Sequence, residues 1–161
     1  MPNWSLTEYS ITNKDQNLLE TLKKEFDNAF QITKIKNDFG EKWLGNILSY
    51  LGMSDDEVLA SDCKGWTEYN PEIEFNADSN TYTLYMFSET AWEPIPNPLQ
   101  KMVEKFAPDS EILYYSETPN SNIYTTNDPN MVGKRFEKYD DDLLDDEENT
   151  PNFWEYVPLK K

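Results

Sequence analysis

The side chains that most enzymes use for acid–base or nucleophilic chemistry are scarce in this sequence. It contains no histidine, so the commonest general base and the commonest transition-metal ligand are both absent. Its single cysteine, Cys63, has no histidine to activate it and cannot form an internal disulfide. Five scattered glycines form neither a phosphate-binding loop nor a dinucleotide-binding turn. We therefore expect a protein that is not an enzyme and that uses no cofactor or metal.

Carboxylates are the abundant reactive groups. Aspartate and glutamate total 31 against 14 lysines and arginines, which gives a net charge of −17. Residues 137–148 hold eight acids and one base, so −7 lies in this run and −10 in the rest of the chain. The run contains five aspartates: Asp140, Asp141, Asp142, Asp145 and Asp146. It lacks the alternating ligands and central glycine of an EF-hand loop, so we interpret it as a solvated segment and keep cation binding as an alternative.

The charge also restricts the kind of partner. An acidic surface opposes direct binding to nucleic-acid phosphates or to anionic lipid. It suits a basic protein surface, including a groove that another protein uses for nucleic acid. The candidate partner-binding residues outside the acidic run are four acids and two aromatic residues: Glu72, Glu74, Glu89, Glu93, Trp66 and Tyr69.

Length and composition indicate one folded domain. The chain has 161 residues, and 14% of them are aromatic, which favours a packed core over a disordered acidic chain. The residues after Met1 are polar and lack the apolar core of a signal peptide. No apolar run approaches the ~20 residues that span a membrane. We expect a cytoplasmic protein that binds neither membrane nor nucleic acid directly.

Hydrophobic periodicity predicts the elements. Alternation predicts strands at residues 4–11, 72–77, 81–87 and 112–116, with a hairpin turn at 78–80. Apolar residues at helical spacing predict helices at 15–30 and 98–106. Residues 31–70 form a mainly helical insertion that ends in a loop from about residue 61, and further strands are expected at 123–126 and 135–139. We expect Trp92 to be a buried anchor where the hairpin meets the last helix.

The order of these elements contains βαββαβ, the ferredoxin-like plan. That plan is an α+β fold with an antiparallel sheet and its helices on one face. We therefore predict a ferredoxin-like domain at residues 1–136, with the insertion at about 31–70 and extra C-terminal strands. An acidic segment at 137–161 follows, and its aromatic end can dock on the domain.

Three short motifs carry a family resemblance. Pro2-Asn3-Trp4 opens the first strand, Gly65-Trp66 lies near the second, and Thr90-Ala91-Trp92 is followed by Pro94 before the last helix. Over residues 2–126 the chain resembles the YubB-type ferredoxin-like family of conjugative plasmids, phages and bacterial genomes. It departs from that family at Ser5, where relatives usually carry cysteine. The family has no established activity, so the resemblance implies a fold and a mobile-element origin but no reaction.

These observations lead to one main hypothesis and two alternatives. The main hypothesis is an inhibitor that occupies the basic nucleic-acid-binding groove of a host protein, as a DNA mimic does. The first alternative is a carboxylate-dependent or divalent-cation-binding protein. The second is a small stable domain whose charge serves only solubility.

Overall fold

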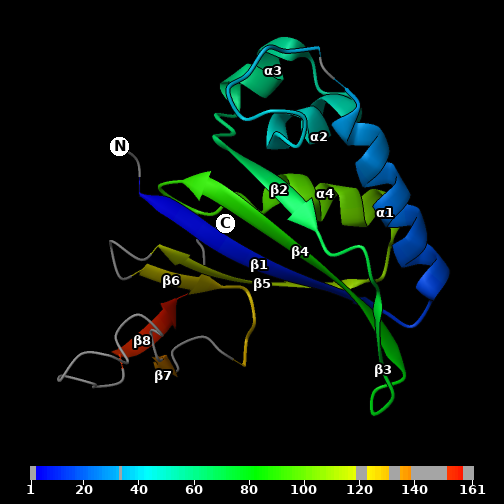
Figure 1. Ribbon diagram of the computed structural model, residues 1–161, viewed down its shortest axis with the longest axis vertical. Helices are drawn as coiled ribbons and strands as arrows, with labels where there is room; N and C mark the ends of the chain where they lie inside the picture. Colours follow the sequence, from blue (N-terminus) through cyan, green and yellow to red (C-terminus); the bar gives the residue numbers. More distant parts are fainter. Residues whose placement is uncertain (1–2, 33, 119–122, 131–134, 139–151, 158–161) are drawn as a thin grey trace.

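A sheet with helices on one side organises the chain (Figure 1). The computed structural model describes residues 3–32, 34–118, 123–130, 135–138 and 152–157, the last two segments as strands only. The helices are α1 (Gln16–Phe30), α2 (Leu44–Tyr50), α3 (Asp55–Ala60) and α4 (Asn97–Phe106). The strands are β1 (Trp4–Asn13), β2 (Gly65–Tyr69), β3 (Glu74–Asn76), β4 (Thr81–Ala91), β5 (Glu111–Thr118), β6 (Ile123–Thr126), β7 (Arg135–Lys138) and β8 (Asn152–Val157).

The strands follow the order β2-β4-β1-β5-β6-β8-β7, and β3 pairs with β4. Every pairing among β1 to β6 is antiparallel. β8 joins the sheet parallel to β6. The predicted α+β class and antiparallel sheet are confirmed, while β8 adds a parallel pairing that the sequence patterns did not predict.

The partner of the β4 strand differs from the prediction. We predicted one strand at residues 72–77 and a loop at 61–71, but β4 pairs with two short strands, β2 and β3. β2 lacks apolar alternation, which is why its sequence gives no strand signal. Its first residue is held close to β4, since a Cβ on Gly65 would lie 2.2 Å from the carbonyl oxygen of Glu89. β2 therefore forms through backbone pairing with β4, which glycine allows to come close, and not through an apolar face of its own.

The helices form where capping groups and apolar stripes predict them. Asp15 caps α1 by accepting a hydrogen bond from the backbone N–H of Asn17. Ser54 and Glu57 form a capping box at the start of α3. α4 begins one residue earlier than predicted, and its N-cap is Pro96 without a side-chain hydrogen bond. Side-chain caps therefore mark where α1 and α3 begin, whereas α4 begins after a proline without one.

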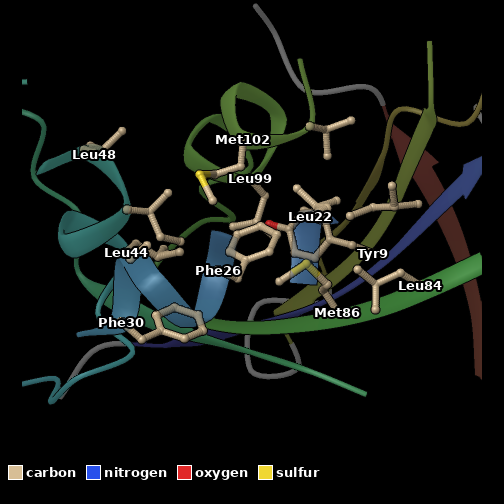
Figure 2. Packing of buried hydrophobic residues seen from close by; sticks show 14 of the residues in the cluster. Tyr9, Leu22, Phe26, Phe30, Leu44, Leu48, Leu84, Met86, Leu99 and Met102 are labelled. Carbon is tan, nitrogen blue, oxygen red and sulfur yellow. The ribbon is translucent and has the colours of Figure 1, made fainter. Parts of the chain in front are cut away.

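The core lies between the helices and the sheet. Figure 2 shows side chains of α1, α2 and α4 meeting side chains of β1 and β4. Tyr9, Leu22, Phe26, Met86 and Leu99 are all fully buried there. Each such side chain contributes roughly 1.5–3 kcal/mol through burial. This side of the sheet is therefore packed with core residues, and any site on the sheet must use the opposite face or its margins.

β1 is regular along its length, although its apolar residues change phase. Trp4 and Leu6 share one face while Tyr9 and Ile11 share the other, and the unbroken pairing with β4 shows that this is a strand with two different faces and not a bulge. Ser5 and Thr7 share the helix-side face with Tyr9 and are buried. The Thr7 hydroxyl donates to Ser116 Oγ at 3.0 Å, and other hydroxyls on this face pair similarly. On the helix-side face of β1, hydrogen-bonded hydroxyls of Ser5 and Thr7 therefore stand where Tyr9 and Ile11 carry apolar groups further along the strand.

Candidate protein-binding surface

The face of the sheet opposite the helices is the strongest candidate site (Figure 1). Because successive side chains of a strand point to opposite faces, every second residue of β1, β4 and β5 points there. Leu6, Glu8, Phe87, Glu89 and Glu117 lie together on it and line a hollow of about 460 Å³. Two apolar side chains remain in solvent, since Leu6 is 39% and Phe87 45% exposed. A surface that combines exposed apolar groups with carboxylates is typical of a binding face.

The strand register places four carboxylates in a zigzag across β2, β4, β1 and β5. Glu68 lies opposite Phe87, so Glu89, two residues further along, is its diagonal neighbour. The same rule makes Glu8 the diagonal neighbour of Glu89 and of Glu117. Diagonal neighbours lie roughly 7–8 Å apart. We call Glu68, Glu89, Glu8 and Glu117 the acidic zigzag.

Few ion pairs compensate Glu8, Glu68 and Glu89 within the part of the chain that the structure describes. Lys42 Nζ lies 3.5 Å from a carboxylate oxygen of Glu68, and both side chains are exposed. Glu8 and Glu89 have no ion pair within the described part of the chain. Two unit charges ~7.5 Å apart in water repel by about 0.5 kcal/mol. The free protein therefore holds this row at some cost in stability, which a basic partner would relieve.

Apolar and aromatic side chains occupy the gaps of the zigzag. Leu6 lies directly between Glu89 and Glu117, with one neighbour on each adjacent strand. Tyr115 lies opposite Glu8, and its hydroxyl donates a hydrogen bond of 2.7 Å to the Asp128 carboxylate. Burial and this carboxylate raise the pKa of Tyr115, so the phenol stays protonated at neutral pH. The surface thus alternates charge with fixed ring and alkyl groups.

The two predicted aromatic residues lie on different sides of β2. Trp66 lies opposite Glu89 and is half-buried, and its ring lies 5.2 Å from that of Trp4. Tyr69 instead packs against the core, and its hydroxyl donates to Asp27 on α1. Burial and this carboxylate raise the pKa of Tyr69 to about 12. Only Trp66 therefore belongs to the candidate surface.

Trp92 was predicted to be buried, and this prediction is wrong, because the side chain is 56% exposed. The Glu93 N–H donates to the Ala91 carbonyl at 2.9 Å, and Trp92 between them has φ 73°. This is a γ-turn with positive φ, the rare and strained form. It is clamped by bonds from the Trp92 N–H to the Asn3 carbonyl, 2.7 Å, and from the Thr90 hydroxyl to the Glu93 carbonyl, 2.6 Å. A strained turn that presents an indole to solvent is a feature of binding sites rather than of cores.

The remaining predicted acids are dispersed. Glu74 is exposed on β3 opposite Thr83, several residues away from the zigzag, and Glu72 is exposed in the β2–β3 connection. Glu93 is exposed after the γ-turn and lines a different hollow, beside α4. The acids predicted in the C-terminal run lie outside the described residues: Asp140, Asp141, Asp142, Asp145 and Asp146. Of the predicted site residues that the structure describes, only Glu89 and Trp66 therefore lie together on the candidate surface.

Sequence reasoning missed three members of the zigzag. Glu8, Glu68 and Glu117 each alternate with an apolar or aromatic neighbour on the same strand. That alternation was a usable signal for β1, where Leu6 and Glu8 share a face. It was unusable for β2, which was assigned to a loop. A carboxylate row that crosses four strands also depends on register, which no single strand reveals.

Other chemistry finds little support in the described residues. Within them, no three histidine, cysteine, aspartate or glutamate side chains converge as metal ligands. Cys63 is buried, and burial raises the pKa of its thiol, which disfavours the reactive thiolate. The described residues also include no helix of the length and apolarity that a bilayer crossing requires.

Comparisons with known proteins add no assignment. No protein-family model matches the chain, and searches of curated proteins and of solved structures gave no match. The functional argument therefore depends on the geometry of the sheet face alone.

Proposed function

We propose that this protein is a non-enzymatic acidic interaction protein that occupies the basic nucleic-acid-binding groove of another protein. The observation that carries the proposal is the acidic zigzag on the helix-free face of the sheet. Strands lie about 4.8 Å apart, so the zigzag offers one carboxylate per ~4.8 Å across the sheet. One strand of DNA offers a phosphate charge per ~3.4 Å of axis. The two linear charge densities are close enough for one basic groove to accept either.

The rigidity of the row supports the proposal further. Its members stand on paired β-strands, and Leu6 between two of them fixes their separation. Fixed charges lose less conformational entropy on binding than charges on a flexible segment. We therefore expect the zigzag to lose little conformational entropy when it meets a basic groove.

A ferredoxin-like fold and a mobile-element origin belong to the same proposal. The sheet order β2-β4-β1-β5, with α1 and α4 connecting its strands, supports a ferredoxin-like core. The motifs at Asn3-Trp4 and Thr90-Ala91-Trp92 lie together, since the Trp92 N–H donates to the Asn3 carbonyl. An inhibitor carried by a phage or plasmid and acting on a host protein would need no catalytic residues.

A pull-down from bacterial lysate tests the proposal. The chain should retain a nucleic-acid-binding protein at low salt, lose it as salt rises, and lose it to added duplex DNA. Replacing Glu8, Glu89 and Glu117 by glutamine should weaken the isolated complex about tenfold, if each surface pair is worth ~0.5 kcal/mol. The control variant removes three exposed acids elsewhere, Glu20→Gln, Glu41→Gln and Asp78→Asn, and has the same net charge.

The zigzag variant and the control variant together show whether the zigzag itself recognises the partner or whether any acid on the surface does. If both lose affinity equally, overall charge rather than the zigzag attracts the partner, and the mimicry proposal fails. A partner whose binding resists both salt and DNA would also exclude mimicry. If no basic protein is retained at low salt, the charge serves solubility only.

A further inference from the structure

A second hollow lies on the helix side of the sheet, between α4 and strands β5 and β6. Its volume is about 950 Å³, at the upper end of the range for ligand pockets. One wall is a single stripe of α4, on which Asn97, Gln100, Glu104 and Ala107 follow each other at three- or four-residue spacing. We call this hollow the α4 groove. No residue of the acidic zigzag lines it, so it is a separate surface.

The α4 groove is negatively charged from end to end. Glu93 lines it before α4 begins, Glu104 lines its middle, and Asp109 lines it after α4 ends. No lysine or arginine is among its lining residues in the described chain. The carbonyl end of α4 points toward the Asp109 end and adds the negative pole of the helix dipole. The groove therefore selects for a ligand with positive charges.

The opposite wall offers an apolar surface and a hydrogen-bond donor, the hydroxyl of a largely buried tyrosine. Tyr114 lines the groove and is only 4% exposed, and its hydroxyl has no hydrogen-bond partner within the described residues. Burial raises its pKa, so the hydroxyl keeps its proton. Ile112, beside it on β5, and Val103 of α4 contribute apolar side chains. Ser49 Oγ is the only buried side-chain polar atom without a partner among the described residues, so the Tyr114 hydroxyl is open to solvent at the groove. A ligand carbonyl can accept its hydrogen bond there in place of water.

The dimensions fit a short extended peptide. α4 has ten residues and is therefore about 15 Å long. An extended chain rises ~3.3 Å per residue, so four or five residues span the groove. We propose that the α4 groove binds an extended basic peptide, whose lysine or arginine side chains meet Glu93, Glu104 and Asp109 and whose backbone accepts a hydrogen bond from Tyr114.

Binding of a dansyl-labelled peptide, Arg-Leu-Lys-Val-Arg, to the full chain tests the proposal by fluorescence anisotropy. Glu104→Gln and Asp109→Asn should each weaken binding about two- to fivefold, the range of an exposed ion pair. Asparagine suits position 109, where φ is 65°. Gln100→Trp places an indole on the groove stripe and should abolish binding. Tyr114→Phe should weaken binding without lowering the thermal midpoint.

Three controls decide the result. Glu89→Gln removes one charge from the opposite face, so it should leave peptide affinity unchanged while it weakens the partner of the proposed function. The peptide Gln-Leu-Gln-Val-Gln should not bind. Equal losses in Glu89→Gln and Glu104→Gln, or spermidine binding as tightly as the basic peptide, would show unspecific charge attraction and overturn the groove. Unchanged affinity in a correctly folded Gln100→Trp variant would overturn it as well.

Discussion

The γ-turn at Trp92 gives a specific prediction because partial burial of the indole stabilises the fold while the positive φ of the same residue destabilises it. The indole is 56% exposed, so it buries about 90 Å² of its roughly 200 Å² surface, worth about 2 kcal/mol. A residue with a Cβ in the left-handed region costs roughly 1–2 kcal/mol, and Trp92 has φ 73°. Trp92→Ala removes the burial and keeps the strain, so it should destabilise by about 2 kcal/mol. Trp92→Gly removes both but adds a backbone entropy cost of ~0.5–1 kcal/mol, so it should destabilise by only about 1 kcal/mol.

The difference in stability between the alanine and glycine variants measures the backbone strain at position 92 separately from the loss of the indole. Both lose the same indole and differ only in a methyl group, so glycine should exceed alanine in stability by about 1 kcal/mol. At an ordinary position alanine is favoured by ~0.5–1 kcal/mol, because glycine loses more backbone entropy. With a urea slope of 1–3 kcal/mol/M, the expected gap is about 0.5 M in the midpoint. An alanine variant equal to or more stable than the glycine variant would refute the strained turn. A loss of 3–5 kcal/mol in both would show a buried tryptophan.

Three further predictions follow from the sheet. Replacing Glu8 and Glu89 by glutamine should raise the urea midpoint at low salt, since repulsion of about 0.5 kcal/mol per neighbouring pair is relieved, and the gain should shrink at 1 M salt. Gly65→Ala should destabilise strongly, by more than 2 kcal/mol in urea unfolding, because its Cβ would lie 2.2 Å from the Glu89 carbonyl. The pKa of Tyr69 is raised to about 12 from the ordinary tyrosine value near 10. This shift stabilises the fold below about pH 10, and the contribution is lost as the pH approaches 12. Urea unfolding between pH 8 and 11.5 should therefore show a steeper loss for the wild type than for Tyr69→Phe.

The elements with a strong period were predictable from the sequence. α1 is amphipathic over four turns, and its apolar residues at helical spacing form the buried stripe from Leu19 to Phe30, while Leu18, which the same spacing includes, is half-buried. β4 carries alternation from Tyr82 onward, although it continues to Ala91, four residues beyond the predicted end. Polar residues at the end of β4, such as Ser88 and Thr90, are buried through hydrogen bonds to other groups. Hydrophobicity alone could not extend the strand across them.

The candidate site was less predictable because it depends on contacts between distant segments. Glu8 and Glu117 are 109 residues apart in the sequence and become diagonal neighbours only through the register of β1 and β5. The turn at Trp92 is held by local hydrogen bonds and by a tertiary one to Asn3, 89 residues earlier in the chain. The prolines that follow it favour a stiff corner, but they do not specify the positive φ of Trp92. Hydrogen bonds between distant segments therefore determine the register of the acidic zigzag and help to hold the turn at Trp92, neither of which hydrophobic periodicity specifies.

The pattern of the sheet face favours recognition over solubility as the reason for its charge. A surface that evolves only for solubility gains from replacing exposed apolar residues as well as from adding acids. This face does the opposite, since Leu6 and Phe87 stay exposed between Glu8, Glu89 and Glu117. Apolar groups in a charged frame gain free energy when a partner removes them from water, and the acids select a basic partner for that contact. Replacing Leu6 and Phe87 by threonine, a good strand former, should therefore preserve the salt dependence of partner binding and lower its affinity. If charge were the whole interaction, the affinity would not change.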